Sequence, residues 1–179
     1  MYLISAYFDD ETTFKIQQYI NQIAQKTGNT FMLDGCVPPH ITLSSFETRQ
    51  EEQIISLLKQ NVKDIRQGKV QWTSVSAFLP YVIFLSPVLN QYLHNLSEHI
   101  YSCIRQAEDI RIRPCYQPFS WMPHTTVGKK LSKAEMQAAF QVLQHQFGPF
   151  SGYVTKIGLA KTNPYTNLAV FELKEGESQ

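Results

Sequence analysis

The chain has 179 residues, of which 43% are hydrophobic and 17% are charged, and its formal net charge is +1 at pH 7. This composition excludes an intrinsically disordered chain, because it supplies enough apolar surface to offset the conformational entropy lost on folding. The near-neutral charge also excludes an extended nucleic-acid surface, so any phosphate has to be bound locally.

The cysteines and the first residues indicate a cytoplasmic protein. Cys36, Cys103 and Cys115 are odd in number and lack CxxC spacing, so they predict neither a disulfide framework nor a zinc site. Residues 1–8 have no basic segment before their apolar residues and predict a first β-strand rather than a signal peptide. No apolar run approaches the roughly 20 residues that span a bilayer, so no membrane contact is expected.

After this strand, the first half of the chain predicts a helix, a strand, a second helix and a β-hairpin. Apolar residues recur at helical spacing between Phe14 and Ile23, and Gly28 follows as a C-terminal stop. The remaining elements are a strand over 39–46, a helix that begins near 51 and stops before 68, and a hairpin of strands 70–78 and 81–85 around Leu79-Pro80.

The second half predicts the same order again. Ser132 and Glu135 form a capping-box signature at the start of its second helix. The expected elements are a helix over 89–104, an irregular loop over about 108–120, a strand opening at 122–127, a helix from 132, and strands over 153–160 and 168–173 around a turn at 162–165.

The two halves share one sequence offset, which distinguishes a duplication from a coincidence. The offset of 84 residues relates His40 to His124, Pro39 to Pro123, Thr42 to Thr126, and Pro80-Tyr81 to Pro164-Tyr165. We therefore predict an α+β fold with bilobal pseudo-two-fold symmetry, in which each lobe is an antiparallel sheet with outer helices beside a central cleft. Within one domain over 1–179, we expect lobe 1 over about 1–88 and lobe 2 over about 89–179.

The repeated segments carry residues suited to acid–base chemistry. Residues i and i+2 of a strand point to the same side, so His40 shares a face with Thr42, and His124 shares a face with Thr126. Thr125 occupies a position that is apolar in the first segment. A pseudo-two-fold arrangement would bring both pairs to one site.

Two histidines can run phosphodiester cleavage near neutrality, because an imidazole with a pKa of about 6.5 serves as either base or acid. One ring removes a proton from the attacking water, and the other protonates the departing alkoxide. The threonine hydroxyls donate hydrogen bonds to the non-bridging oxygens as negative charge develops. The sequence lacks the carboxylate cluster of a magnesium- or manganese-dependent phosphodiesterase, so we expect neither metal nor cofactor.

A single His-x-Thr has little weight, because one such match among five histidines is expected by chance and is more typical of a strand end. Two matches in register favour the catalytic interpretation. His94, His99 and His145 lie in helical stretches without this pattern, and we expect them to be surface or packing residues.

At these residues the sequence resembles the 2H phosphoesterase superfamily, which includes the RNA 2'-5' ligase and cyclic phosphodiesterase proteins. That superfamily is defined by two His-hydrophobic-[Ser/Thr]-hydrophobic motifs on a bilobal, LigT-like fold. The segment 40–43 conforms fully, and the segment 124–127 departs from the pattern at Thr125.

The resemblance implies metal-independent hydrolysis of a nucleotide or RNA 2',3'-cyclic phosphate, or a related 2'-5' linkage, with weak reverse ligation in some members. Substrates vary widely in this superfamily, so the reaction class transfers better than the substrate. Family members often carry a basic residue five positions after the second histidine, where Lys129 stands. Lys129 is either a phosphate-neutralising residue or a solvated lysine.

Four aromatic residues are weaker substrate-binding candidates. Tyr81, Tyr165 and Trp121 either stack on a base or pack locally. Tyr116 lies in the loop over 108–120, which closes over a substrate or grips a second phosphate, or else is a solvated connector.

The leading hypothesis is a monomeric, cytoplasmic cyclic phosphodiesterase with a role in RNA processing. A binding module that holds an RNA end or a phosphorylated small molecule without turnover is the alternative, and a structural protein with a decayed site is a third possibility. The two-fold symmetry leaves open which histidine is the acid and which is the base.

Overall fold

Local signals at the helix ends agree with the structure, a computed structural model that describes residues 1–176. The Asp9 carboxylate accepts a hydrogen bond from the Thr12 amide at 2.8 Å and begins the first helix, which ends at Gly28 with a positive φ of 75°. The predicted capping box of Ser132 and Glu135 is confirmed. The ends of these helices are therefore encoded locally.

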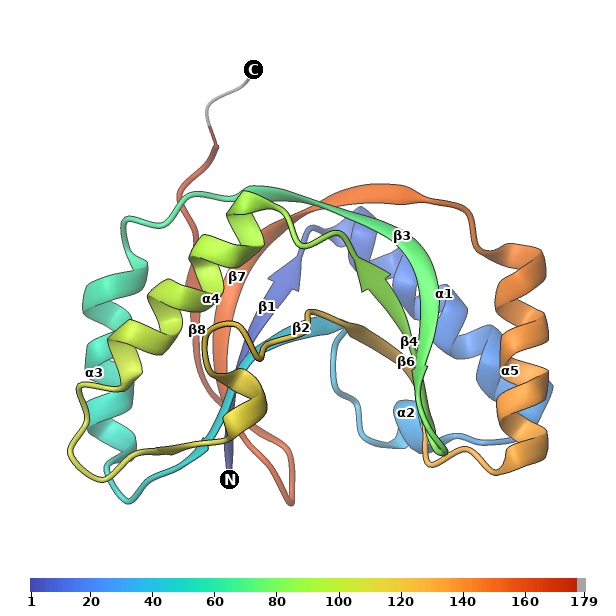
Figure 1. Cartoon of the computed structure of the whole chain (residues 1–179), viewed down its shortest axis with the longest axis horizontal. Coiled ribbons are helices and arrows are strands. Elements are labelled where there is room, and N and C mark those ends of the chain that lie inside the picture. Colours follow the sequence, from blue (N-terminus) through green and yellow to red (C-terminus); the bar gives the residue numbers. More distant parts are fainter. Residues whose placement is uncertain (177–179) are drawn as a thin grey trace.

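The predicted element order is confirmed in both halves of the chain. Helix, strand, helix and hairpin occur first as α1, β2, α3 and β3–β4, and again as α4, β6, α5 and β7–β8 (Figure 1). The elements are β1 (Tyr2–Phe8), α1 (Asp10–Thr27), α2 (Phe31–Asp34), β2 (His40–Glu47), α3 (Glu51–Val62), β3 (Gly68–Phe78), β4 (Val82–Pro87), α4 (Gln91–Ile104), β5 (Arg111–Ile112), the 3-10 helix η1 (Pro114–Tyr116), β6 (Thr125–Lys129), α5 (Lys133–Gln146), β7 (Phe150–Lys161) and β8 (Thr166–Glu172).

The strands form an antiparallel sheet, so the predicted α+β class is confirmed. Their order is β5-β2-β1-β7-β3-β4-β6, and β8 pairs with β7. The long strand β7 pairs with β3 near its start and with β1 over the rest of its length, which joins strands from both halves of the sequence. The boundary expected near residue 88 falls between β4 and α4, and a division into two lobes at that point stays a prediction.

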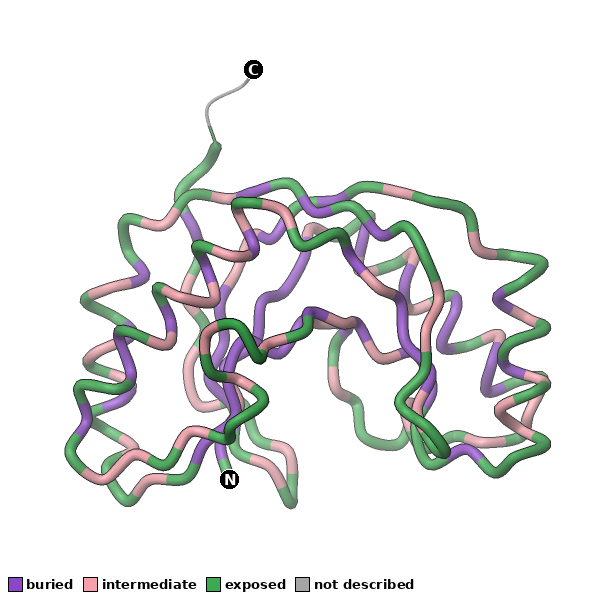
Figure 2. Tube along the Cα trace, viewed as in Figure 1, coloured by how far each residue is buried: buried purple, intermediate pink, exposed green. Residues whose placement is uncertain are grey.

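The helices flank the strands in two pairs. Helix α1 packs on α5 and helix α3 packs on α4, and Figure 1 shows these pairs at opposite ends of the arched strands. Buried positions concentrate along the strands and on the inward faces of the helices (Figure 2). The fully buried Trp72 ring lies edge-on to Phe8 and stacks on Phe150, with ring centroids 4.9 Å apart in each case. Burial of one such ring contributes roughly 4–6 kcal/mol.

Three local expectations differ from the structure. The short helix α2 was not predicted, because four residues are too few to show helical periodicity. The loop over 108–120 contains β5 and η1, which are also too short to predict. Strand β6 begins at Thr125 rather than at 122, so His124 immediately precedes the strand; Pro123, which lacks an N–H, cannot extend the hydrogen-bonded ladder there.

Candidate active site

The first candidate histidine, His40, is the first residue of β2 and is half-buried. Its Nδ1 lies 2.7 Å from the carbonyl oxygen of Pro38, two residues earlier in the chain. A carbonyl can only accept a hydrogen bond, so this contact places the proton of the neutral ring on Nδ1. The Nε2 atom then carries the free lone pair.

The second candidate, His124, has the same local geometry. Its Nδ1 lies 2.9 Å from the carbonyl oxygen of Met122, again two residues earlier. The ring is half-buried and also keeps its lone pair on Nε2. Both histidines are therefore held as the same tautomer by the backbone of the segment that leads into each strand.

The fold brings these two segments together. Strands β2 and β6 contact each other although they lie far apart in the order of the sheet. The indole Nε1 of Trp121 donates a hydrogen bond of 2.9 Å to the backbone carbonyl of Thr42. This bond joins the segment before His124 to strand β2, which begins at His40. The fold therefore places the two His-x-Thr segments close together.

Burial lowers the pKa of both histidines below the usual value of 6.5. The hydrogen bonds to the Pro38 and Met122 carbonyls oppose this shift, because they favour the protonated rings. The pKa of His40 is lowered further by the nearby positive charges of protonated His124 and of Lys129. Both imidazoles are therefore neutral at pH 7 in the free protein.

His40 has a tyrosine, Tyr7, as its aromatic neighbour. The Tyr7 ring lies edge-on to the imidazole with centroids 6.2 Å apart, and Tyr7 pairs with His40 across β1 and β2. The hydroxyls of Tyr7 and Tyr165 are 2.9 Å apart. Burial, together with the neighbouring Tyr165, raises the pKa of Tyr7 far above its usual value, so its hydroxyl stays protonated. The turn between β7 and β8 thus reaches the site through Tyr165.

Two phenylalanine side chains pack against His124 instead. The Phe78 ring lies edge-on to the imidazole at 4.9 Å between centroids, and the Phe84 ring lies at 5.3 Å. Phe84 is fully buried, whereas Phe78 keeps 41% of its surface exposed. This apolar contact is consistent with burial as the cause of the lowered pKa of His124.

The threonines differ in exposure. Thr42 is buried with 8% of its surface exposed, and Thr126 is half-buried. Thr125, the residue that departs from the motif, is fully buried and lies 3.1 Å from the Trp72 indole nitrogen, which donates to its hydroxyl. A buried indole N–H needs an acceptor, and this hydrogen bond explains why a threonine occupies an apolar position.

Two further predicted residues, Lys129 and Tyr81, lie at the same end of the β4–β6 pair. Lys129 is exposed at the end of β6, and its charge acts on His40. Its Nζ lies 6.0 Å from the centroid of the Phe31 ring. Tyr81 lies in the β3–β4 turn with 61% of its surface exposed, and its backbone carbonyl accepts a hydrogen bond from the Leu131 amide. The charge of Lys129 therefore reaches His40, whereas the Tyr81 side chain is largely exposed to solvent.

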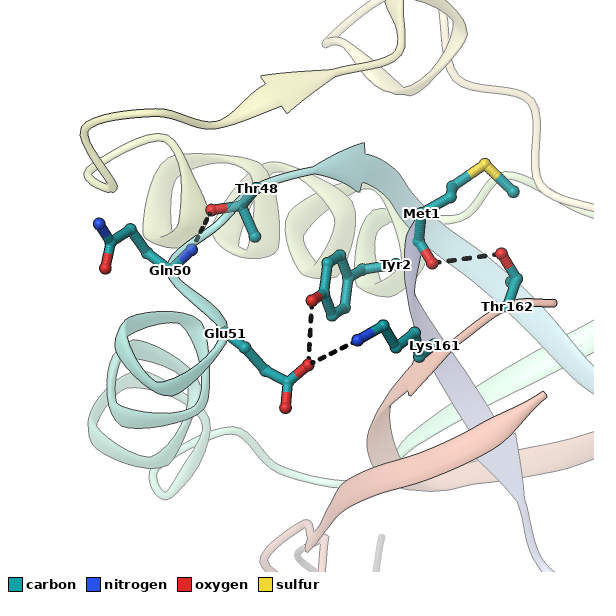
Figure 3. Close-up of polar contacts among 7 residues, drawn as sticks. All are labelled: Met1, Tyr2, Thr48, Gln50, Glu51, Lys161 and Thr162. Atoms are coloured by element: carbon teal, nitrogen blue, oxygen red, sulfur yellow. Dashed lines mark hydrogen bonds and ion pairs between the residues drawn. The ribbon is translucent and has the colours of Figure 1, made fainter. Parts of the chain in front are cut away.

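Two cavities lie outside the histidine pair. A cavity of about 490 Å³ lies beyond the end of β2 and is lined by Met1, Tyr2, Glu47, Thr48, Arg49, Asp109 and Arg111. Beside it, the Tyr2 hydroxyl donates to Glu51 Oε2 at 2.9 Å and Lys161 Nζ lies 3.6 Å from the same oxygen (Figure 3). A cavity of about 190 Å³ is lined by Gln17, Met32, Leu33, Cys36, Val37 and Pro38.

Two negative observations hold for residues 1–176. These residues contain no group of three or more His, Cys, Asp or Glu side chains arranged to hold a metal ion. None of the helices in the same range is long and apolar enough to cross a membrane.

Comparison with known sequences decides the family. The sequence model of the 2'-5' RNA ligase superfamily matches residues 13–165, which include both His-x-Thr segments. The chain belongs to the 2'-5' RNA ligase superfamily. The resemblance to 2H phosphoesterases predicted from the two motifs is thereby confirmed.

Relatives of this superfamily member extend over most of its length. A candidate phosphoesterase of Bacillus licheniformis is 29% identical over 126 residues, which is 68% of each chain. A candidate phosphoesterase of Geobacillus kaustophilus is 26% identical over 150 residues, which is 81% of this chain and 80% of the relative.

Solved structures share the fold at low identity. Escherichia coli LigT in complex with 3'-AMP has a TM-score of 0.62 and 17% identity over 96% of this chain and 97% of LigT. A protein of Thermus thermophilus has a TM-score of 0.66 and 14% identity over 99% of both chains. These likenesses show that the superfamily member has the LigT-like fold.

Three neighbours of the histidines were not predicted from the sequence. Tyr7 lies in the first strand, and Phe78 and Phe84 lie in the hairpin of the first half, although Phe78 and Phe84 contact the histidine of the second half. No motif marks them, because their proximity depends on the pairing of β1 with β2 and of β4 with β6. An argument from the repeat of 84 residues alone would place each hairpin beside the histidine of its own half. Phe78 and Phe84 do not follow that rule, because they belong to the first hairpin and contact His124.

Proposed function

We propose that this protein is a phosphodiesterase that hydrolyses the 2',3'-cyclic phosphate of a nucleotide or an RNA end, or a related 2'-5' linkage, by two-histidine acid–base catalysis. The observation that carries the proposal is the matched pair of Nδ1 contacts of His40 and His124. These contacts leave two Nε2 atoms for proton transfer in one site, one to accept a proton and one to donate it. Superfamily membership supports a phosphoesterase.

In the first proton transfer, Nε2 of one neutral imidazole removes a proton from water. The water oxygen then forms a bond to the phosphorus atom of the cyclic phosphate. The other proton of the same ring stays on Nδ1, which continues to donate a hydrogen bond to the backbone carbonyl, and this hydrogen bond stabilises the imidazolium that forms. The base has to be neutral to act, and the lowered pKa values of His40 and His124 meet that requirement at pH 7.

In the second transfer, the other imidazole acts from its protonated form. Its Nε2 proton passes to the 3' oxygen as the bond between phosphorus and that oxygen breaks, which leaves a 2'-phosphate and a free 3' hydroxyl. The negative charge of a bound phosphate favours this protonated form and so offsets the lowered pKa of the free site. The two proton transfers therefore balance, and one histidine ends protonated while the other ends neutral.

Two kinds of side chain support the phosphate during these steps. Thr42 and Thr126 donate hydrogen bonds to the non-bridging oxygens, where negative charge accumulates in the transition state. Lys129, whose positive charge already acts on His40, neutralises part of the phosphate charge from the end of β6.

The test is hydrolysis of the four 2',3'-cyclic nucleotides and of a 2'-5'-linked dinucleotide, followed by phosphorus NMR in the presence and absence of EDTA. We expect conversion of cyclic phosphate to a 2'-phosphate with EDTA present, and no conversion by the His40→Ala/His124→Ala double variant. His99→Ala is the matched control, because the His99 ring hydrogen-bonds the Asn61 carbonyl, away from both His-x-Thr segments. Equal turnover by the double variant and the wild type would refute the proposal.

The same samples separate the enzyme from a binding module. Titration calorimetry with a cyclic nucleotide measures binding independently of product formation. Tight binding of the cyclic phosphate by the wild type without any product in the NMR spectrum would establish the binding module instead.

A further inference from the structure

The turn between β7 and β8, over residues 162–165, is attached to the first strand at two points. At one point, the amide and the hydroxyl of Thr162 both donate to the Met1 carbonyl, at 3.0 Å and 3.2 Å, and Figure 3 shows the hydroxyl contact. At the other point, the hydroxyl oxygens of Tyr165 and Tyr7 are 2.9 Å apart, so one hydroxyl donates to the other. The turn is therefore fixed near both ends of β1.

The Tyr7 ring is held between this turn and the neighbouring strand β7. It lies over the backbone of Gly158, where an added Cβ atom would overlap the ring, so only glycine leaves room for it. Tyr7 is buried with 8% of its surface exposed. Burial, together with the neighbouring Tyr165, raises the pKa of Tyr7, so its hydroxyl stays protonated. The hydrogen bond between the two hydroxyls therefore persists over the whole pH range in which histidines titrate.

The Tyr7 ring in turn contacts the imidazole of His40. The two residues are paired across β1 and β2, and their rings meet edge-on with centroids 6.2 Å apart. The hydrogen bond from His40 Nδ1 to the Pro38 carbonyl restrains one atom of the imidazole. A ring held at one atom can still swing about that point, so a second contact is needed to fix the direction of Nε2. The Tyr7 ring supplies this contact.

The two hairpins thus serve the histidines in a crossed pattern. Two phenylalanines of the β3–β4 hairpin, in the first half of the chain, lie against His124. The β7–β8 hairpin, in the second half, reaches His40 through Tyr165 and its hydroxyl partner. Tyr81, which the offset of 84 residues equates with Tyr165, keeps 61% of its surface exposed. The contact that Tyr165 makes is therefore specific to the second hairpin.

We propose that Tyr165 is a positioning residue that acts through Tyr7 on His40. The Tyr165 hydroxyl holds the Tyr7 ring against the imidazole, and Nε2 of His40 thereby stays directed at the substrate phosphate. This role rests on the proposed function, because it concerns the same proton transfer. It requires the hydroxyl of Tyr165, whereas stacking on a base, one of the roles predicted from the sequence, requires only the ring.

A double-mutant cycle on a 2',3'-cyclic nucleotide tests this role. Tyr165→Phe and Tyr7→Phe each keep the ring and remove the same hydrogen bond, so we expect each to lower kcat about 10-fold with a smaller change in KM. The double variant should be no worse than either single variant, because only one hydrogen bond is lost. A wild-type kcat for Tyr165→Phe, or a loss of about 100-fold in the double variant, would overturn the proposal.

Gly158→Ala reaches the same ring from its other side. The added Cβ displaces the Tyr7 ring, so we expect kcat to fall at least about 10-fold. A Tyr7→Ala background leaves room for the Cβ, and there the same change should have no further effect. A loss that persists in full in that background would overturn the role of the Tyr7 ring.

Two matched controls should keep the wild-type kcat. In Gly148→Ala, no described atom beyond the chain neighbours lies within 4 Å of the added Cβ. Tyr101→Phe removes a hydroxyl from a tyrosine on helix α4, away from both histidines. A 10-fold loss in either control would show that such changes lower kcat wherever they are made, and would remove the support for a specific role of Tyr165.

NMR titration of the two imidazoles in the free protein gives a readout that needs no turnover. Tyr165→Phe should raise the pKa of His40, because a loosened Tyr7 ring admits water to an imidazole whose pKa is lowered by burial. The His124 signal should titrate as in the wild type. An inactive wild type would contradict the proposed function, while this titration still decides the role of Tyr165. An unchanged His40, or equal shifts of both histidines, would overturn that role.

Discussion

The two His-x-Thr segments, His40–Thr42 and His124–Thr126, have the same backbone geometry in different surroundings. Each histidine places Nδ1 on the carbonyl two residues earlier, within 2.7 to 2.9 Å. Beyond that contact, His40 lies beside Tyr7 and near Lys129, whereas His124 lies against the rings of Phe78 and Phe84. The contacts that set the tautomer are thus local and are the same in both segments, while the residues packed around each ring differ.

The middle residues of the two segments, Ile41 and Thr125, also differ in their surroundings. Ile41 and Thr125 are both fully buried, but Thr125 accepts a hydrogen bond from Trp72. The position equivalent to Trp72 in the second half is Lys156, which is only partly buried. The polar Thr125 at the apolar position of the motif therefore supplies the hydrogen-bond acceptor that the buried Trp72 N–H needs. Its polarity does not indicate a degraded site.

The largest expected effect is the loss of either histidine. If both rings transfer protons, His40→Ala and His124→Ala should each lower kcat/KM by at least about 100-fold, despite their different surroundings. Because acid and base act in one transition state, the double variant should be little worse than the poorer single variant. Steady-state kinetics on a cyclic nucleotide measures both effects. Near-normal kinetics of one single variant would show that the motifs are not functionally equivalent.

An intermediate effect is expected at the middle positions. Thr125→Val should lower the free energy of unfolding by roughly 1–3 kcal/mol, because it leaves the buried Trp72 N–H without an acceptor. Thr125→Ser keeps the acceptor and should cost less. Ile41→Val, the equivalent change in the first motif, should cost only about 0.5–1.5 kcal/mol through lost packing. Urea unfolding measures the free energy of unfolding of all three variants. Equal stabilities of Thr125→Val and Thr125→Ser would contradict the role of Thr125 as the acceptor for Trp72.

The smallest expected effect is a selective change in histidine titration. Burial lowers the pKa of both rings, so the base becomes protonated only below pH 6.5 and the maximum of kcat/KM should lie on the acidic side of that value. Phe78→Ala admits water to His124 and should raise the pKa of that ring alone, because Phe78 contacts His124. This change should move the acidic limb or the alkaline limb of the pH profile to higher pH, and the limb that moves reports whether His124 is the base or the acid.

NMR titration of the two imidazoles in the free protein provides the direct measurement. The His124 signal should titrate at higher pH in Phe78→Ala than in the wild type, and the His40 signal should stay nearly unchanged. Phe14→Ala, an exposed substitution on α1, is the matched control for loss of a surface phenylalanine. A shift of both histidines by the same amount would show that the two surroundings are not separate.

The sequence alone determined the local features of this protein. Short-range patterns predict the helix stop at Gly28, the helix start at Ser132 and the repeated order of elements. The constant offset predicts the pair of histidines. The contact of each histidine with the preceding carbonyl is also local, since it spans only two residues.

Only the tertiary structure decided which residues surround the two histidines. Tyr7 reaches His40 through the register of β1 and β2, and Phe84 reaches His124 through the register of β4 and β6. Trp121 reaches the Thr42 carbonyl from a part of the chain that also pairs β5 with the end of β2. Strand register and edge pairing depend on contacts between residues far apart in the chain, and a pattern of neighbouring residues does not encode them.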